Sequence, residues 1–275
     1  MSFWYKLNLT ARIGLGVLLL FAIVAPLAPF VSPHDPNEQN LSRRLEGPSI
    51  QNLLGRDEFG RDILSRIIFG SRVSLSVGIL VVSISLAVGV SVGIVVGYVG
   101  GWFDELVMRL VDVVLAFPGI LLAIALMAVL GQSLVNVVLA LCITGWAPFA
   151  RLARGEALSM RERQFVVAAR ALGASLPRVV MRHILPNIIS PILVKATLGM
   201  AGVIVAEAAL SFLGLGVRPP TPSWGAMLNA GRAFILVTPH LVIFPGIAIM
   251  LVVLSLNFVG DGLRDLLDPR HETRL

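Results

Sequence analysis

Ionisable side chains within long apolar runs are the residues of this chain that could do chemistry. Glu207 lies deep in one such run, and Lys195 precedes it by about 18 Å along a helix axis. That distance keeps the two side chains from pairing directly. A carboxyl group at this depth is costly unless it faces protein or water. Glu207 is therefore expected either to line a translocation pathway or to be buried in helix packing.

The remaining titratable residues form no recognisable catalytic or metal-binding set. Arg109 and Asp112 are three residues apart and are expected to form a structural salt bridge. The single cysteine, Cys142, excludes an intrachain disulfide. No Cys/His ligand spacing is present, so neither a metal site nor a resident cofactor is expected. The chain also has no Gly-x-x-x-x-Gly-Lys-Ser/Thr run with which to cradle ATP, so the sequence predicts no enzyme.

The densest charge lies in the segment Arg151–Asn187, which separates two long apolar blocks. It contains seven arginines against two acids. Among short loops, this much positive charge marks the cytoplasmic side of a membrane. The arginines are suited to anionic lipid headgroups or to acids on a partner. They show no interleaving with aromatic residues, so nucleic acid is not an expected partner.

Two short helices are expected inside this basic segment. Good helix formers over Arg161–Leu172 predict the first, and Gly173 is expected to stop it at a sharp turn. Leu176–Ile184 predicts the second, which is expected to end before Pro186. Together they would form a compact knob on the cytoplasmic surface.

The composition places the chain among all-α polytopic membrane proteins. It is 56% hydrophobic and 14% charged, with a mean hydropathy of +0.88, whereas soluble domains carry about 25% charged residues. Several apolar runs reach the roughly 20 residues that a membrane helix needs, which excludes the short alternating segments of a β-barrel. The basic residues before the first run resemble a signal peptide, but its length and the spans that follow favour a retained anchor.

Six transmembrane helices are expected, with the N- and C-termini in the cytoplasm. Pro118 is expected to kink the third of them. In the second, Gly89, Gly93 and Gly97 form a stripe of small residues that would let another helix approach closely. The six expected spans are Ile13–Val31, Ser74–Tyr98, Leu106–Leu130, Leu134–Ala150, Ile189–Leu213 and His240–Val259.

The connections outside these spans divide the chain into two regions. Residues 1–72 are expected to form an anchor helix and an extracytoplasmic segment, and residues 73–275 a core that contains the basic loop at 151–188. The spacing of Ile63, Leu64, Ile67 and Ile68 predicts a separate amphipathic helix along the outer surface. Two further expectations concern single residues: Asp104 as the N-cap of the third span, and Trp224 at the outer membrane interface.

The internal spacing of the basic loop resembles the cytoplasmic signature loop of ABC importer permeases. In this family the loop begins Glu-Ala-Ala and continues to a glycine and then Leu-Pro. Ala168-Ala169, Gly173 and Leu185-Pro186 stand at those positions, with Val167 in place of the glutamate. His183 stands where an isoleucine is usual. A salt bridge from position 167 is therefore not expected, whereas the helix–turn–helix shape is.

Motifs elsewhere extend the resemblance over nearly the whole chain, to the second, C-type permease subunit of the dipeptide, oligopeptide and nickel importers. They are Leu54-Gly55-Arg56-Asp57, Gly60-Arg61-Asp62 with Ser65-Arg66, Ser211-Phe212-Leu213-Gly214-Leu215-Gly216, Pro219-Pro220, Ser223-Trp224-Gly225, Gly260-Asp261-Gly262-Leu263-Arg264-Asp265 and Leu267-Asp268-Pro269. Arg56 stands where threonine is common.

This resemblance implies the type I ABC importer permease fold in a bacterial inner membrane. The partners it implies are a homologous permease subunit in a heterodimer, two cytoplasmic ATPases and an extracytoplasmic solute-binding protein. A helix of the basic loop, the coupling helix, would dock on one ATPase. Closure of the two ATPases on ATP would then switch the permease between inward-open and outward-open states. The residues expected at this contact are Arg163, Val167, Ala168, Ala169, Gly173, Leu185 and Pro186.

Peptide import is the leading hypothesis for the function. The first alternative is a nickel-complex importer of the same architecture; no histidine-methionine cluster lines a span, which favours peptide. A different class of protein, an ion-coupled secondary transporter, would use Glu207 as a proton site. The absence of an evident internal repeat counts against that class.

Overall fold

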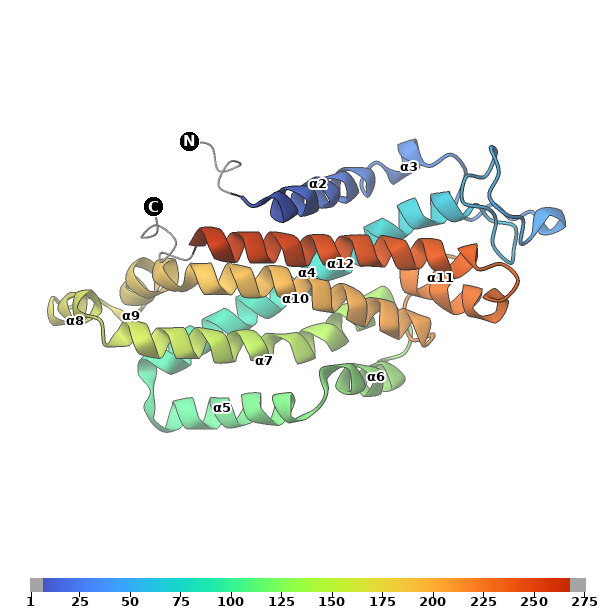
Figure 1. Cartoon of the computed structure of the whole chain (residues 1–275). Coiled ribbons are helices and arrows are strands. Elements are labelled where there is room, and N and C mark those ends of the chain that lie inside the picture. The colour runs from blue at the N-terminus through green and yellow to red at the C-terminus, as the bar shows by residue number, and fades with distance from the viewer. Residues whose placement is uncertain (1–6, 268–275) are drawn as a thin grey trace.

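Four long helices form the body of the molecule (Figure 1). A computed structural model describes residues 7–267. The long helices are α4 (Ile63–Val99), α7 (Leu134–Arg161), α10 (Leu185–Phe212) and α12 (His240–Leu267). The other elements are α2 (Leu9–Val24), α3 (Ala28–Val31), η1 (Leu41–Arg43), α5 (Gly101–Ala116), α6 (Gly119–Leu130), α8 (Gln164–Ala171), α9 (Leu176–Val179), the π-helical turn η2 (Val180–Ile184), α11 (Trp224–Gly231) and η3 (Arg232–Phe234).

By length and apolar character, four to five membrane spans are evident in residues 7–267. Each of the four long helices is long and apolar enough to cross a membrane, and α10 does so together with the α9–η2 turns before it. The fifth candidate is the pair α5 and α6, which bend by 86° at Phe117-Pro118. This bend confirms the predicted kink. Helix α2 has 16 residues, or about 24 Å, which falls short of a hydrocarbon core of about 30 Å.

Helix α4 begins at Ile63, so the predicted separate amphipathic helix is wrong. Asp62 caps the helix by accepting a hydrogen bond from the Ser65 amide at 2.8 Å. The helix continues without a break to Val99, and Gly100, whose φ is +70°, ends it. The surface-like periodicity after Ile63 is therefore the first turns of a 37-residue helix, and the expected boundary between residues 72 and 73 lies inside it.

Close packing of α4 on α7 confirms the predicted role of the glycine stripe. A Cβ atom at Gly89 would lie 2.4 Å from the Trp146 carbonyl oxygen, and one at Gly93 would lie 2.3 Å from that of Ala150. Real Cβ atoms do not approach this closely. The absence of side chains at these positions is what lets the two backbones touch.

Two predicted roles of charged residues in α5 are wrong. Helix α5 begins at Gly101, so Asp104 lies within its first turn and caps nothing; it accepts hydrogen bonds from Arg154 Nε and Nη2 at 2.8 and 2.6 Å. Arg109 pairs with Glu105 one turn back, and Asp112 pairs with Arg151. The neighbouring helix α7 supplies the arginines for two of these acids, which spacing within α5 could not reveal.

Trp224 lies in the core rather than at the outer membrane interface. Its side chain is fully buried, its indole N–H donates to the Ile67 carbonyl oxygen at 3.0 Å, and its ring contacts Phe21 edge-on. Gly70 provides the space, since a Cβ there would lie 2.9 Å from the indole. Trp224 thus ties α11 to α4 and α2.

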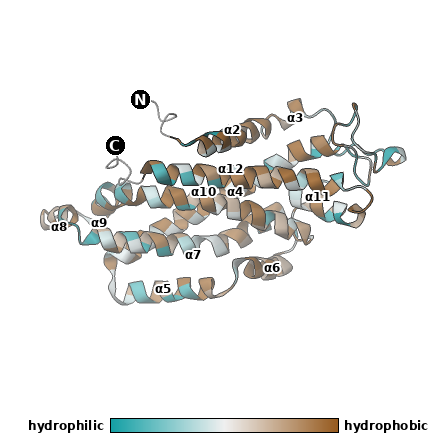
Figure 2. Ribbon diagram, viewed as in Figure 1, coloured by the Kyte–Doolittle hydropathy of each residue, from teal (hydrophilic) through white to brown (hydrophobic). Residues whose placement is uncertain are grey.

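The polar elements gather at the two ends of the bundle (Figure 2). The loops between α3 and α4 and helix α11 lie at one end, and α8 and α9 project from the other (Figure 1). Helix α2 starts and α12 finishes toward the α8 end, where the Asn8 amide donates to Asp265 at 3.3 Å. The tail motif residues Asp268 and Pro269 lie outside the described residues.

Candidate functional site

The first part of the basic segment, 151–161, continues the long helix α7 beyond the predicted end of the span at Ala150, and the expected short helices follow with different limits. Arg163 has an extended backbone and precedes α8, so the predicted helix from Arg161 is broken there. The second predicted helix does not end before Pro186, because α9 continues through the π-helical turn into α10. The π-helical turn directly before Pro186 shifts the hydrogen-bond pattern where proline has no N–H to donate, so the helix continues through this position.

Gly173 forms the turn between α8 and α9. Its φ is +79°, and its amide donates to the Arg170 carbonyl oxygen at 2.9 Å. The next amide, of Ala174, donates to the Ala169 carbonyl oxygen at 3.0 Å. This pair of hydrogen bonds is the Schellman motif, in which glycine is favoured at the left-handed position.

One face of the knob is built into the bundle core. Val166 of α8, Val179 of α9 and Ile184 of η2 are fully buried in a single apolar cluster. The same cluster contains residues of three long helices: Val90 and Ile94 of α4, Ala153 and Ala157 of α7, and Ile188 and Ile192 of α10. A force applied to α8 therefore acts on the ends of all three helices.

The opposite face of the knob is apolar and exposed. Leu172 is 88% exposed, Met181 62% and Val167 49%. Among the residues expected at the ATPase contact, Arg163, Val167, Ala168, Gly173 and Pro186 are exposed, Leu185 is half-buried and Ala169 is buried. Ala169 thus lies on the inner side of α8, where its small side chain permits close packing. Phe165, at 44% exposure, belongs to the outer face although no motif pointed to it.

The arginines of the segment divide into two groups. Arg151, Arg154 and Arg161 form ion pairs within the chain, and Arg170 lies 5.6 Å from the centre of the Tyr98 ring. Arg163, Arg178 and Arg182 are exposed and form no ion pair with any of residues 7–267. The exposed group lies at the start of α8, in α9 and in η2, the same short elements that carry the exposed apolar residues, and is available to a partner or to lipid.

Glu207 lies between α10 and α4 and is completely buried. Its carboxylate oxygens accept hydrogen bonds from the hydroxyls of Ser74 at 2.9 Å and Ser211 at 2.8 Å. Ser74 was not expected from the sequence to meet it, because 133 positions separate the two residues. This arrangement fits the helix-packing interpretation of Glu207; its part in a translocation pathway stays a prediction.

An apolar cavity of about 250 Å³ lies between α4, α6, α7 and α10. Lys195 and Thr144 are among its few polar residues, and Gly119, just after the bend, is also in its wall. The Ser85 hydroxyl lines it too and is buried without a hydrogen-bond partner in the described chain. Nothing in the sequence around Ser85 distinguishes it, since serines recur along α4.

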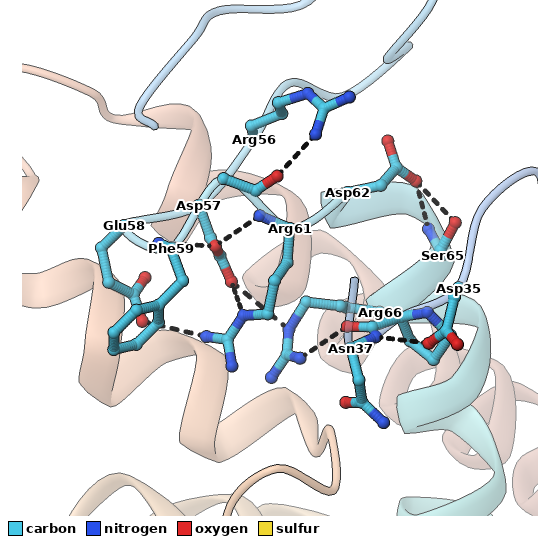
Figure 3. A network of polar contacts seen from close by, with 12 residues as sticks. Asp35, Asn37, Arg56, Asp57, Glu58, Phe59, Arg61, Asp62, Ser65 and Arg66 are labelled. Atoms are coloured by element: carbon cyan, nitrogen blue, oxygen red, sulfur yellow. Dashed lines mark hydrogen bonds and ion pairs between the residues drawn. The ribbon is translucent and has the colours of Figure 1, made fainter. Parts of the chain in front are cut away.

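A charged network lies at the other end of the bundle, before α4 (Figure 3). Arg61 Nε donates to Asp57 Oδ2 at 2.6 Å, and its Nη2 donates to Glu58 at 3.0 Å. Arg66 Nε lies 3.5 Å from the same Asp57 oxygen, and its Nη1 donates to the Pro36 carbonyl oxygen. The network lines a cavity of about 530 Å³. No group of three or more acidic, histidine or cysteine residues within 7–267 is arranged to hold a metal.

The chain is similar to known membrane components of transport systems in both sequence and fold. Residues 89–273 match the family described as binding-protein-dependent transport system inner membrane component, and residues 4–48 match the N-terminal TM domain of oligopeptide transport permease C. Among solved structures, a chain of the inward-facing MetNI methionine ABC transporter is similar with a TM-score of 0.59 and 16% identity, covering 71% of this chain and 93% of that one.

Curated relatives match along almost the full length. The dipeptide transport system permease protein DppC of Alkalihalophilus pseudofirmus is 48% identical over 268 residues, which are 98% of this chain and 88% of the relative. The glutathione transport system permease protein GsiD of Shigella flexneri is 48% identical over 273 residues, or 98% and 90%. GsiD of Escherichia coli is 46% identical over the same span.

The helical bundle with its projecting knob is thus an ABC transporter permease fold. The chain belongs to the family of inner membrane components of binding-protein-dependent transport systems. It is a multi-pass permease subunit of the inner membrane, it is not the ATPase, and it works within an ABC transporter complex.

Proposed function

We propose that this chain is the permease subunit of an ATP-driven importer of dipeptides or oligopeptides. The named substrates of its relatives, dipeptides and glutathione, are both short peptides. The nickel-complex alternative has no such support among these relatives. An ion-coupled secondary transporter does not fit a family of binding-protein-dependent systems.

The proposed assembly has four kinds of subunit: this chain, a homologous permease paired with it as a heterodimer, two cytoplasmic ATPases and an extracytoplasmic solute-binding protein. We propose six transmembrane helices with both ends in the cytoplasm, made by α2, α4, the bent pair α5 and α6, α7, α10 and α12. Support comes from the apolar character of α2 and from the fact that its start and the end of α12 lie toward the end of the bundle from which the knob projects.

The observation that carries the coupling role is the two-sided knob. Its exposed face offers apolar side chains and unpaired arginines to an ATPase, and its buried face joins α4, α7 and α10. A rigid element that contacts a moving partner on one side and three helices on the other can bias a two-state bundle. The proposed contact residues are Arg163, Val167, Ala168, Gly173 and Pro186 on the surface, with Ala169 and Leu185 behind them.

Uptake by the reconstituted transporter tests the substrate and the energy source together. The complete complex in proteoliposomes, with ATP on the ATPase side and the binding protein on the other, is expected to accumulate labelled dipeptide. Radioactive nickel uptake under the same conditions would instead support the alternative. Accumulation driven by a pH gradient without ATP would contradict the proposed mechanism.

A cross-link tests the knob itself. A photo-cross-linker at position 172, the most exposed apolar residue of the knob, is expected to attach to an ATPase subunit. The same group at Ile50, exposed in the loop between α3 and α4 that lies at the opposite end of the bundle, is the matched control and is expected to leave the ATPases unlabelled. Equal labelling from both positions would contradict the assignment.

A further inference from the structure

The cavity beside the charged network, called the outer cavity below, is large enough to hold a small molecule. Its volume of about 530 Å³ lies within the range of about 300–1,000 Å³ that is usual for ligand sites. Its walls come from segments far apart in the chain: the loop before α4, the α6–α7 turn, the stretch after α10, helix α11 and the start of α12. Apolar walls include Ile63, Met227 and Leu241, and neutral polar ones include Gln132, Ser211 and Asn229.

Two arginines with unused donors lie side by side in this cavity. Both Arg61 and Arg66 line it, and both contact the same oxygen of Asp57, so the guanidinium groups are neighbours. Arg61 Nη1 and Arg66 Nη2 have no hydrogen-bond partner among residues 7–267. In Figure 3 these two nitrogens point to the same side of the network. Two adjacent guanidinium groups with free N–H donors match the oxygens of a carboxylate.

An incoming carboxylate would have to replace one of the acids that already balance the two arginines. Among residues 7–267, the acids paired with Arg61 and Arg66 are Asp57 and Glu58, so the network is neutral when both acids are ionised. Burial, and then the nearby Asp57, raise the pKa of Glu58. Glu58 makes a single arginine contact, whereas Asp57 contacts both arginines and accepts two backbone N–H groups, so Glu58 is the acid that an incoming carboxylate would replace. The compensation that buried charges require is then supplied by the ligand.

We propose that this cavity is a subsite of the permease that binds the C-terminal carboxylate of a short peptide through Arg61 and Arg66. The inference rests on the proposed function in taking a peptide as the transported molecule. The neutral polar groups face the peptide backbone, and the apolar wall receives a side chain. An acidic side chain of the binding protein is a separate occupant, which the experiment below distinguishes.

Calorimetry on the complete membrane complex in lipid nanodiscs, without the binding protein, tests the subsite. The probes are the dipeptide Ala-Phe and its C-terminal amide, which has the same shape but no carboxylate. The acid is expected to bind at least 10-fold more tightly than the amide. Equal affinity for the two probes, no binding of the acid, or complete displacement of the acid by an equal concentration of inorganic phosphate would overturn the proposal.

Three variants of the chain sharpen the test. Arg66→Lys keeps the positive charge but removes the planar fork, and is expected to weaken binding of the acid at least 5-fold without changing that of the amide. Thr221→Trp fills the exposed rim of the cavity and is expected to weaken binding of both probes. Because it leaves the arginines in place, it tests the subsite even if Arg66→Lys folds poorly. Arg218→Ala removes an exposed arginine of the same region that does not line the cavity, and is expected to bind like the unmodified chain.

The remaining outcomes separate this subsite from its alternatives. If the cavity variants leave Ala-Phe binding intact but weaken attachment of the binding protein, the network serves docking and the subsite does not exist. If the complete transporter imports Ala-Phe while the nanodisc complex binds none, the subsite fails and the proposed function stands. If the complete transporter imports no peptide, the proposed function fails.

Discussion

At residue 173 the backbone has a φ of +79°, and a Cβ atom there would meet no other atom within 4 Å. Glycine is therefore required at this position by its positive φ and not by a lack of space for a side chain. An L-residue in this conformation costs about 1–2 kcal/mol. The turn sets the angle between α8 and α9, so its geometry decides how the exposed face is presented to an ATPase.

Replacement of Gly173 is therefore expected to uncouple the transporter. Gly173→Pro cannot adopt a positive φ and is expected to abolish substrate-stimulated ATPase activity, whereas Gly173→Ala is expected to reduce it several-fold. The measurement is ATP hydrolysis by the reconstituted complex with and without loaded binding protein. Gly155→Ala in α7 is the matched control, because that glycine is exposed, has no positive φ and also has open space around it. Unchanged stimulation in Gly173→Pro would contradict the coupling role.

Two substitutions of Glu207 distinguish a role in helix packing from a role in transport. Gln can exchange hydrogen bonds with both Ser74 and Ser211, so Glu207→Gln is expected to retain the thermal unfolding midpoint. Glu207→Leu leaves two buried hydroxyls without their acceptor and is expected to lower stability by about 1–3 kcal/mol. Thermal unfolding in detergent measures both. A Glu207→Gln protein that is stable but transports nothing would show that the carboxylate serves the pathway.

The elements hold together through close helix contacts, most of all between α4 and α7. Asp62 caps the start of α4 and Gly100 ends the helix. The glycine stripe of α4 lets it pack closely against α7. The 86° bend between α5 and α6 turns α6 toward the apolar cavity that Gly119 lines. Because of this bend at Pro118, the wall is formed by α6 and not by α5.

Adding a single methyl group to the stripe is expected to separate α4 from α7. In Gly93→Ala the new Cβ would lie 2.3 Å from the Ala150 carbonyl oxygen, which is backbone and cannot rotate away. Overpacking of this kind costs about 1–3 kcal/mol. Gly202→Ala in α10 meets nothing within 4 Å and is expected to be neutral or slightly stabilising. Thermal unfolding of the two variants compares them, and equal midpoints would contradict the packing argument.

Over the whole molecule, polar ends and an apolar middle define its orientation in the membrane. The knob with its unpaired arginines lies at one end, and the charged network with its cavity lies at the other (Figure 1). A force received at the knob must therefore travel the length of the bundle to reach the outer cavity. The long, unbroken helix α4, about 55 Å at 1.5 Å per residue, links the two ends directly.

Cysteine labelling tests this orientation. With native Cys142 replaced by alanine, Leu172→Cys is expected to react with a membrane-impermeant maleimide only after the cells are opened. Ile50→Cys, which is 97% exposed at the opposite end, is expected to react in intact spheroplasts. Labelling of Leu172→Cys from outside would place the knob on the wrong side of the membrane and contradict the proposed topology.

Residue types and local spacing determined much of this protein in advance. Apolar run length indicated a helical membrane protein, and the arginine bias together with the Ala168-Ala169, Gly173 and Leu185-Pro186 spacing indicated the permease family, as the comparisons confirm. The kink at Pro118, the turn at Gly173 and the glycine stripe of α4 were also predictable. Each of these depends on the backbone of one or a few residues, and such preferences act wherever the rest of the chain lies.

Only the tertiary structure decided which distant residues meet. Arg154 of α7 donates to Asp104 of α5, and Trp224 is buried against α4. Ser74 donates to Glu207, which lies 133 positions further along the chain. The start of α4 at Ile63 was missed because its first turns have the periodicity of a surface helix, although Ile63, Ser65 and Arg66 are buried under the outer loops. The free donors of Arg61 and Arg66 share a cavity because five separated segments enclose it. Periodicity reports which face of a helix is apolar, but the partner that covers that face is set by how the helices pack.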